Sequence, residues 1–327
     1  MELRWVSPDG ARLCDPGELH ELRQRDGGFV WLDIPVCDDD AERILLAELG
    51  FHPMAVAEAR QRNHTPRVHV YPDHLFVALH APEIGTGGHV HYLELDQFIS
   101  EHLLVTVHGP LNPVVPLDRA LAETRQVTAR LEAGRLRPVS PFALAYAVVS
   151  AIARREEALV GDLARQVGLL EQRVMGAADE EPQAFLTALF TARHELLTIR
   201  TMASQSAEIY KRAIRLATFV PREGRALLKD LLDQYERVSR ISQSQLDFLT
   251  GVTEFYRART DTKMTIAAER LAVIAAVTLP VTALSSIVGM NVIVNDRTLW
   301  WPLVILLAAM VSLSLILLRW AKRQGWW

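Results

Sequence analysis

The sequence predicts an α+β cytoplasmic domain, followed by a long stalk helix and two C-terminal transmembrane helices. Two apolar runs near the C-terminus carry this prediction. Residues 271–288 hold no charged side chain, and a second apolar run at 299–318 follows a short polar segment. At about 1.5 Å per residue, a helix of this length crosses most of the ~30 Å hydrocarbon core of a bilayer.

The composition limits the classes of function. The chain has 327 residues and a formal net charge of −4, so no basic excess points to nucleic acid as a partner. Its two cysteines, Cys14 and Cys37, offer no disulfide framework or zinc knuckle. The first residues lack a basic segment followed by an apolar one, so we expect no signal peptide.

Charge predicts the orientation of the apolar runs in the membrane. Arg319, Lys322 and Arg323 follow the second run directly, and the positive-inside rule places this end in the cytoplasm. Two spans return the chain to its starting side. We therefore expect a multi-pass protein of the cell (plasma) membrane with both termini in the cytoplasm. Tryptophans at both ends of the second run fit interfacial belts: Trp300, Trp301, Trp320, Trp326 and Trp327.

Three regions are expected along the chain. Residues 1–135 form a cytoplasmic α/β domain, 136–262 a helical and stalk region, and 263–327 a transmembrane hairpin with spans at about 266–288 and 299–318 and a short cytoplasmic tail. Alternating apolar runs and turn residues mark the first region. Strands are expected at Phe29–Asp33, Arg67–Tyr71, Leu75–Ala81, His89–Leu95 and Leu103–His108, and helices at Asp38–Gly50, from Pro53, and at Leu117–Glu132.

Helical periodicity takes over after this domain. Helices are expected at Phe142–Met175 and Gln183–Phe219, and a third from Arg222 to about Val288 would be about 100 Å long. Its first half carries an apolar stripe at coiled-coil spacing, and its second half continues with small and hydroxyl residues. Such residues in a membrane helix indicate either close helix packing or a water-filled path. Because one hairpin cannot enclose a pore, a conducting chain must assemble into an oligomer.

The tripeptide Gly289-Met290-Asn291 ends the first span, and Pro280-Val281-Thr282 precedes it. In these motifs and their positions the sequence resembles the CorA family of divalent-cation channels and transporters, the 2-TM-GxN superfamily. The resemblance covers most of the chain. It includes the segments Trp31–Asp33, Gly50–Ala55, Thr65–Tyr71 and Leu75–Val77, then Leu170-Glu171, Glu195–Leu197 with Arg200, and Asp230–Asp233.

The resemblance implies a CorA-like funnel, a homopentamer embedded in lipid whose first span lines the pore. Asn291, with Gly289 and Met290, would then form the selectivity filter for a hydrated cation, while a helix C-cap is an alternative role for Asn291 that can coexist with it. Thr282 would form a polar ring in the pore. Leu279 and Leu271 would form hydrophobic constrictions that gate by excluding water.

The resemblance also implies regulation by intracellular Mg²⁺, which would be both substrate and regulator, with no permanently bound cofactor. Glu58 and Asp230 match the sensing carboxylates between neighbouring cytoplasmic domains, and Glu254 matches a further acidic position on the stalk. Without the cation such acids repel one another, and with it they are bridged. The alternative for each is an ordinary solvated surface acid.

The sequence departs from the family pattern at both ends of the pore. The outer loop carries Asp296 alone, beside Arg297, where many members have several acids. At the inner end Thr265 and the pair Ala268-Glu269 replace the family's asparagine and Met-Lys pair. These differences leave open the choice among Mg²⁺, Co²⁺, Ni²⁺ and Zn²⁺.

Three functions are therefore considered. The first is a Mg²⁺ and Co²⁺ uptake channel, the second a Zn²⁺ transporter like the related ZntB branch, and the third a non-conducting membrane scaffold. An enzyme is not expected, because no nucleophile with a base, phosphate-binding loop or HExxH motif is found. His89 and His91 share a strand face, but no Cys or acid joins them at ligand spacing, so no zinc site is predicted there.

Overall fold

The structure is a computed structural model that describes residues 1–176, 182–292 and 300–323, and the side chains of these residues except 287–292, 300, 302, 303 and 306. Contacts divide the chain into two units, Met1–Thr250 and Gly251–Trp327. The expected boundaries near 135 and 262 follow changes in residue pattern and remain predictions.

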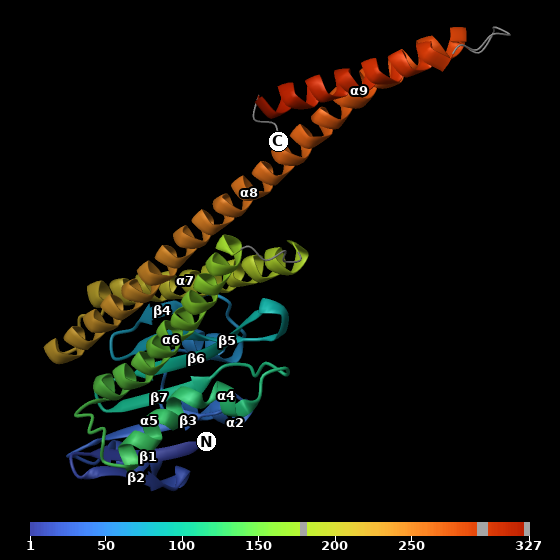
Figure 1. Cartoon of the computed structure of the whole chain (residues 1–327). Helices are drawn as coiled ribbons and strands as arrows, with labels where there is room; N and C mark the ends of the chain where they lie inside the picture. The colour runs from blue at the N-terminus through green and yellow to red at the C-terminus, as the bar shows by residue number, and fades with distance from the viewer. Residues whose placement is uncertain (177–181, 293–299, 324–327) are drawn as a thin grey trace. The chain divides into compact units, whose positions relative to one another are not determined.

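A sheet of seven strands forms the centre of the first unit (Figure 1). The strand order is β2-β1-β3-β7-β6-β5-β4, and β3 pairs with β7 in parallel while the other neighbours are antiparallel. The strands are β1 Glu2–Ser7, β2 Gly10–Cys14, β3 Phe29–Ile34, β4 Arg67–Val70, β5 Leu75–Ile84, β6 Val90–Ile99 and β7 Leu103–His108. The five expected strands are confirmed.

The hairpin of β1 and β2 was not expected. Its first strand contains Arg4, and a charged residue in this position makes the segment look exposed in the sequence although the strand is buried. In the structure Arg4 is buried, its guanidinium stacks over the Trp31 ring at 5.5 Å, and it donates to Glu2 at 2.6 Å. A strand that buries a paired arginine lacks the simple apolar pattern that sequence reading relies on.

Short helices cover one face of the sheet. They are η1 Pro16–Glu18, α1 Leu19–Arg23, α2 Asp39–Arg43, the π-turn η2 Ile44–Glu48 and α3 Pro53–Arg60. The expected helix Asp38–Gly50 is thus divided into α2 and a π-turn. Its ends are as predicted, because Asp38 accepts from the Ala41 amide at 2.8 Å and Gly50 takes a positive φ of 72°.

Longer helices cover the other face, where α6 contacts β3, β5, β6 and β7, and α7 contacts β4 and β5. Ser140 caps α6 by accepting from the Ala143 amide at 3.2 Å. Helices α6 and α7 confirm the expectation that the chain is mainly helical after residue 136. Of the remaining elements, η3 Thr86–Gly88 lies between β5 and β6. The helices α4 Leu117–Ala120, α5 Ala122–Glu132, α6 Pro141–Met175 and α7 Pro182–Leu216 follow β7.

The long helix α8 runs from Arg222 to Val292, as expected from the absence of breakers after Pro221. Its apolar stripe is buried at Leu228, Leu231, Tyr235 and Val238. Ser242, where the stripe weakens in the sequence, is also buried, and its hydroxyl donates to the Val238 carbonyl at 2.9 Å. Helix α9 spans Trp300–Arg323.

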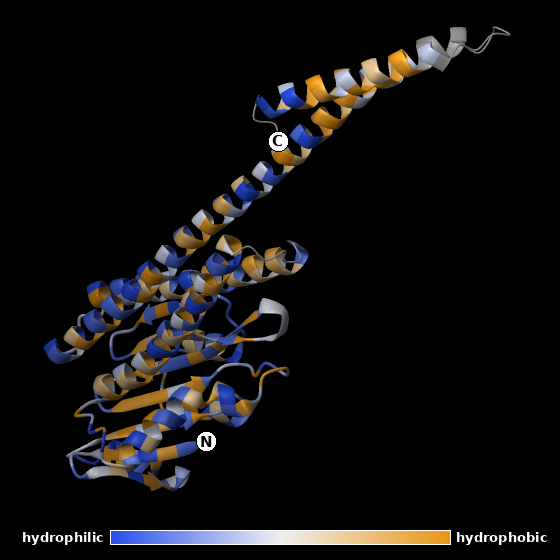
Figure 2. Ribbon diagram, viewed as in Figure 1, coloured by the Kyte–Doolittle hydropathy of each residue, from blue (hydrophilic) through white to orange (hydrophobic). Residues whose placement is uncertain are grey.

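Hydropathy changes along α8, from mixed in its first half to predominantly apolar toward its end, and α9 is apolar as well (Figure 2). Among the described residues, α8 alone is long and apolar enough to cross a membrane, over the segment Arg222–Ser286. The first expected span therefore has a structural counterpart. The role of α9 as a second span remains a prediction.

Candidate functional site

Glu58 lies near the end of α3, where the sequence comparison placed a sensing carboxylate. Two side chains from β4 contact it within the same chain: His69 Nε2 lies 3.0 Å from Oε2, and the Arg67 guanidinium Nη1 lies 3.2 Å from Oε1. The Glu58 side chain is 16% exposed. Its charge is thus partly compensated inside the chain, and a divalent cation would compete with Arg67 for it.

Two further carboxyl groups, Glu94 and Asp96, lie on β6. Glu94 accepts hydrogen bonds from the Asn63 amide at 2.8 Å and from Asn63 Nδ2 at 2.7 Å. Asp96 is fully buried, and neither of its oxygens has a hydrogen-bond partner. Burial above all, and then the charges of Glu94 and Glu58, raise the pKa of Asp96 well above its usual range. Its surroundings therefore favour the protonated form of the carboxyl.

A carboxyl that favours its protonated form is a poor ligand for a hard cation, and Asp96 is such a group. Within the described part of the chain, no group of three His, Cys, Asp or Glu side chains is arranged to hold a metal. If Glu58 binds a cation, it needs ligands from elsewhere.

Asp230 lies on the first half of α8, at an exposed position. Tyr146 Oη on α6 donates to its Oδ2 at 2.6 Å, and Gln234 Nε2 donates to the same oxygen at 2.7 Å. Burial, and then the bond to Asp230, raise the pKa of Tyr146, which keeps the phenol a donor. Since both hydrogen bonds end on Oδ2, Oδ1 remains available to a cation. Sequence reading missed Tyr146 because it lies 84 residues from Asp230.

Glu58 and Asp230 contact different elements, β4 and α6. Across the residues that the structure describes, no hydrogen bond or ion pair joins the two carboxylates. The chain alone does not bring the two predicted sensing residues together. This agrees with their expected placement between neighbouring subunits, which stays a prediction.

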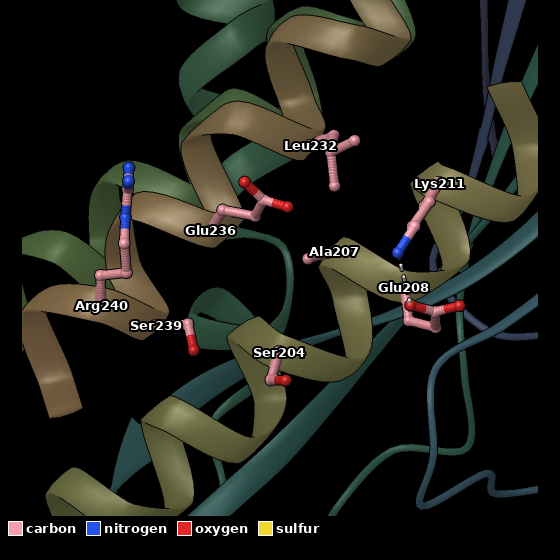
Figure 3. Close-up of a pocket in the computed structure, with 8 residues that line it drawn as sticks. All are labelled: Ser204, Ala207, Glu208, Lys211, Leu232, Glu236, Ser239 and Arg240. Atoms are coloured by element: carbon pink, nitrogen blue, oxygen red, sulfur yellow. Dashed lines mark ion pairs between the residues drawn. The ribbon is translucent and has the colours of Figure 1, made fainter.

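A groove of about 240 Å³ lies between α7 and α8, beginning two residues after Asp230 (Figure 3). Its charged residues are of both signs: Glu208 and Lys211 from α7 form an ion pair at 4.0 Å, and Glu236 and Arg240 come from α8. Opposite charges in equal number give the groove no preference for cations or anions. Ser204, Ala207, Leu232 and Ser239 complete the lining.

The proposed pore residues lie in the apolar part of α8, in the unit Gly251–Trp327. Leu271 and Leu279 are 67% and 68% exposed, and Thr282 and Glu254 are exposed as well. Thr282 Oγ1 donates to the Thr278 carbonyl at 2.8 Å, and Thr278 Oγ1 donates to the Ile274 carbonyl at 2.8 Å. Each hydroxyl has used its proton in the helix, so its oxygen lone pairs are free to face a cation.

The tripeptide falls at the end of this helix. Gly289, Met290 and Asn291 belong to the last turn of α8, which ends at Val292, and their side chains are outside the described set. Asp296 lies outside the described residues altogether. The filter role of Asn291 and the contribution of Asp296 therefore remain predictions from the sequence.

Comparison with known proteins covers nearly the whole chain. The family model described as CorA-like Mg²⁺ transporter protein matches residues 26–323. The chain is 22% identical over 315 residues to YfjQ of Bacillus subtilis (strain 168), whose name assigns it only provisionally to metal ion transport, with 94% of this chain and 93% of YfjQ covered.

Two further proteins extend the comparison. The cobalt/magnesium transport protein CorA of Thermotoga maritima is 19% identical over 279 residues, covering 85% of this chain and 77% of the relative. The complete structure of the CorA magnesium transporter from Methanocaldococcus jannaschii matches 100% of this chain and 99% of its own, with a TM-score of 0.78 and 16% identity. At that identity the structural match shows a shared fold.

Proposed function

The chain belongs to the CorA-like Mg²⁺ transporter family of membrane transporters for divalent cations, and we propose that it takes up Mg²⁺ and Co²⁺ through a homopentameric pore in the plasma membrane. The main support is the family match over residues 26–323, which includes the whole of α8 and its final tripeptide.

The pore is lined by the apolar half of α8. Its exposed leucines, Leu271 and Leu279, form the narrow hydrophobic rings that exclude water when the pore is closed. Thr282 adds a ring of hydroxyl oxygens whose protons are already donated within the helix. Pro280 has no N–H group, so the Ala276 carbonyl one turn earlier lacks its helical donor and adds another oxygen.

The filter is formed by the last turn of α8. Mg²⁺ gives up its water slowly, so a ring of amide and carbonyl oxygens can select it with its hydration shell still in place. Asn291 supplies such an amide, and Gly289 allows the backbone to approach the cation closely. The membrane potential drives entry, at about 2.3 kcal/mol per charge per 100 mV and so twice that for a divalent ion.

The hairpin is completed by α9, whose last turn carries Lys322 and Arg323. This basic end remains in the cytoplasm together with the N-terminal unit. Because a single chain leaves the apolar side chains of α8 exposed, lipid and neighbouring copies of the chain must cover them.

Intracellular Mg²⁺ regulates the pore through Glu58 and Asp230. Asp230 presents one free oxygen at an exposed position, and Glu58 is held by side chains that a divalent cation can replace. Mg²⁺ bridging Asp230 of one subunit and Glu58 of the next would hold the closed assembly. Loss of the cation would leave two acids in repulsion and loosen it.

Flux into liposomes tests this proposal. Purified protein is supplied with Mg²⁺, Co²⁺, Ni²⁺ or Zn²⁺, with and without a pH gradient. We expect Mg²⁺ and Co²⁺ uptake that follows the membrane potential and does not need the pH gradient. Zn²⁺ uptake that requires the pH gradient would instead favour the ZntB-like alternative, and no uptake of any ion would favour a scaffold.

A further inference from the structure

Three fully buried polar side chains from three helices meet in the first unit. They are Glu156 on α6, Ser206 on α7 and Tyr235 on α8, and each residue is 0% exposed. Neither oxygen of Glu156 has a hydrogen-bond partner among the described residues, while the Ser206 hydroxyl lies beside that of Tyr235. Buried polar groups nearly always have a partner, so a fully buried carboxyl without one indicates a site.

The three side chains are close neighbours. Burial above all raises the pKa of Tyr235, the nearby Glu156 carboxyl adds to the rise, and a contact with the Ser206 hydroxyl opposes it. The Tyr235 ring also stacks on Tyr210 of α7, with centroids 5.9 Å apart. The Glu156 carboxyl therefore lies at the junction of α6, α7 and α8.

Contacts on either side fix α6 against α8 at this junction. Tyr146 donates to Asp230 at 2.6 Å, Gln234 donates to Ser150 at 3.2 Å, and Arg237 donates to Glu157 at 3.1 Å. The partners advance in the same direction along both helices. A charge appearing on Glu156 would therefore arise inside a packed interface.

Among the described residues, no cationic side chain is paired with Glu156. The adjacent Arg155 turns to two other acids, since its guanidinium donates to Glu83 and, at 2.9 Å, to Glu123. The other titratable groups near the junction are Glu123, Tyr210 and Tyr235, none of which can carry a positive charge. Burial alone raises the pKa of Glu156 well above its usual range. An unpaired carboxylate in such a place is strongly disfavoured.

We propose that Glu156 is a proton-binding site of the cytoplasmic helices, and that loss of its proton loosens the packing of α8 against α6 and α7. The protonated carboxyl donates one hydrogen bond and accepts others, which suits the hydroxyls of Ser206 and Tyr235. This role is independent of the proposed transport, and it adds a response to pH that the family match does not assign.

The direction of the pH effect follows from proton linkage. Below the ordinary glutamate pKa of about 4.3 the group is protonated in both the folded and the unfolded chain. Above it the unfolded chain releases the proton while the folded chain retains it. Stability therefore falls as pH rises, until the folded group itself ionises.

Thermal unfolding of the full chain in detergent, from about pH 5 to about pH 9, tests this site. We expect the apparent Tm of the wild type to fall with rising pH by up to about 3 °C per unit from this group. Glu156→Gln, which keeps the shape and cannot ionise, should have a higher Tm at the alkaline end and a flatter profile. Asp162→Asn, at an exposed acid of the same helix, should follow the wild type.

Hydrogen exchange of the α8 segment around Tyr235, corrected for its intrinsic pH dependence, locates the effect. Opening of this segment should increase with pH in the wild type and much less in Glu156→Gln. Equal pH dependence of the wild type and Glu156→Gln in both measurements would overturn the proposal.

A spectroscopic measurement serves if Glu156→Gln does not fold. The carboxyl bands of the Asp96→Asn variant are followed by infrared titration, because this substitution removes the other fully buried acid of the described residues from the spectrum. A protonated carboxyl band that persists at neutral pH and disappears at alkaline pH is expected. The absence of such a band at neutral pH would overturn the proposal.

Discussion

In the first half of α8, Leu228, Leu231 and Tyr235 are at most 4% exposed, whereas Leu271 and Leu279 in its second half are more than two-thirds exposed. Both halves carry apolar side chains at helical spacing. The first half buries them against its own chain. The second half finds no such cover, and an apolar surface left open in one chain must meet lipid or another copy.

The acidic side chains of the two halves of α8 differ in the same way. Asp230 on the first half of α8 is held by Tyr146 and Gln234, while Glu254 beyond Thr250 is exposed. One helix therefore serves two purposes. Its first half is a structural part of the unit Met1–Thr250, and the apolar surface of its second half suits an environment outside the chain.

Leucine substitutions give the largest expected contrast. Leu231→Ala should lower the free energy of unfolding of the first unit by about 2–5 kcal/mol, because it opens a cavity in a packed interface. Leu279→Ala, the matched change in the second half, should alter it by less than about 0.5 kcal/mol. Urea unfolding of the full chain in detergent, followed by circular dichroism, measures both. Similar losses in the two variants would remove the distinction between the halves.

The role of Asp230 gives an intermediate effect. Asp230→Ala should raise the Mg²⁺ concentration that protects the chain from proteolysis by about tenfold, which corresponds to about 1.4 kcal/mol of lost binding. Asp230→Asn should raise the protective Mg²⁺ concentration to the same extent, because the amide still accepts a hydrogen bond from Tyr146 but carries no charge.

Asp233→Ala is the control for Asp230, because Asp233 is an exposed acid one turn further along α8. Protection of the Asp233→Ala variant from proteolysis should need the same Mg²⁺ concentration as protection of the wild type. If Asp230→Asn also matches the wild type, Asp230 is a structural partner of Tyr146 and has no sensing role.

The smallest effect is expected at Glu58. Arg67→Ala removes the guanidinium that lies 3.2 Å from Glu58 Oε1 and competes with the cation. Protection should then need less Mg²⁺, by at most about fivefold, because a half-exposed ion pair contributes no more than about 1 kcal/mol. Arg62→Ala removes an exposed arginine without a contact to Glu58 and should have no effect. A higher Mg²⁺ requirement in Arg67→Ala would contradict the proposed competition.

Most of the secondary structure could be predicted because local patterns decide it. Strand β3 is a short, almost wholly apolar run between turn signals, α3 begins at Pro53, and α8 runs unbroken after Pro221. The hairpin β1–β2 could not be predicted, because Arg4 is buried through contacts with Trp31 that exist only in the fold. The π-turn at Ile44–Glu48 has no distinct sequence pattern either.

The candidate site was predictable only in part. The motifs identified Glu58 and Asp230, but their partners lie on other elements, and no spacing rule links Tyr146 to a residue 84 positions away. Glu156 is harder still to recognise from the sequence, because it stands between Arg155 and Glu157 in a charged run that is typical of an exposed helix face. Its burial depends on the side of α6 that faces α7 and α8, which only the packing reveals.

In the proposed function, the second half of α8 lines a pore whose filter contains Asn291. Mg²⁺ flux into liposomes with wild-type protein, Asn291→Ala and the nearby control Asn295→Ala tests it most directly, with oligomer size measured on the same samples. We predict flux in Asn291→Ala at the level of protein-free liposomes, unchanged assembly, and wild-type flux in Asn295→Ala. Wild-type flux in Asn291→Ala would contradict the claim.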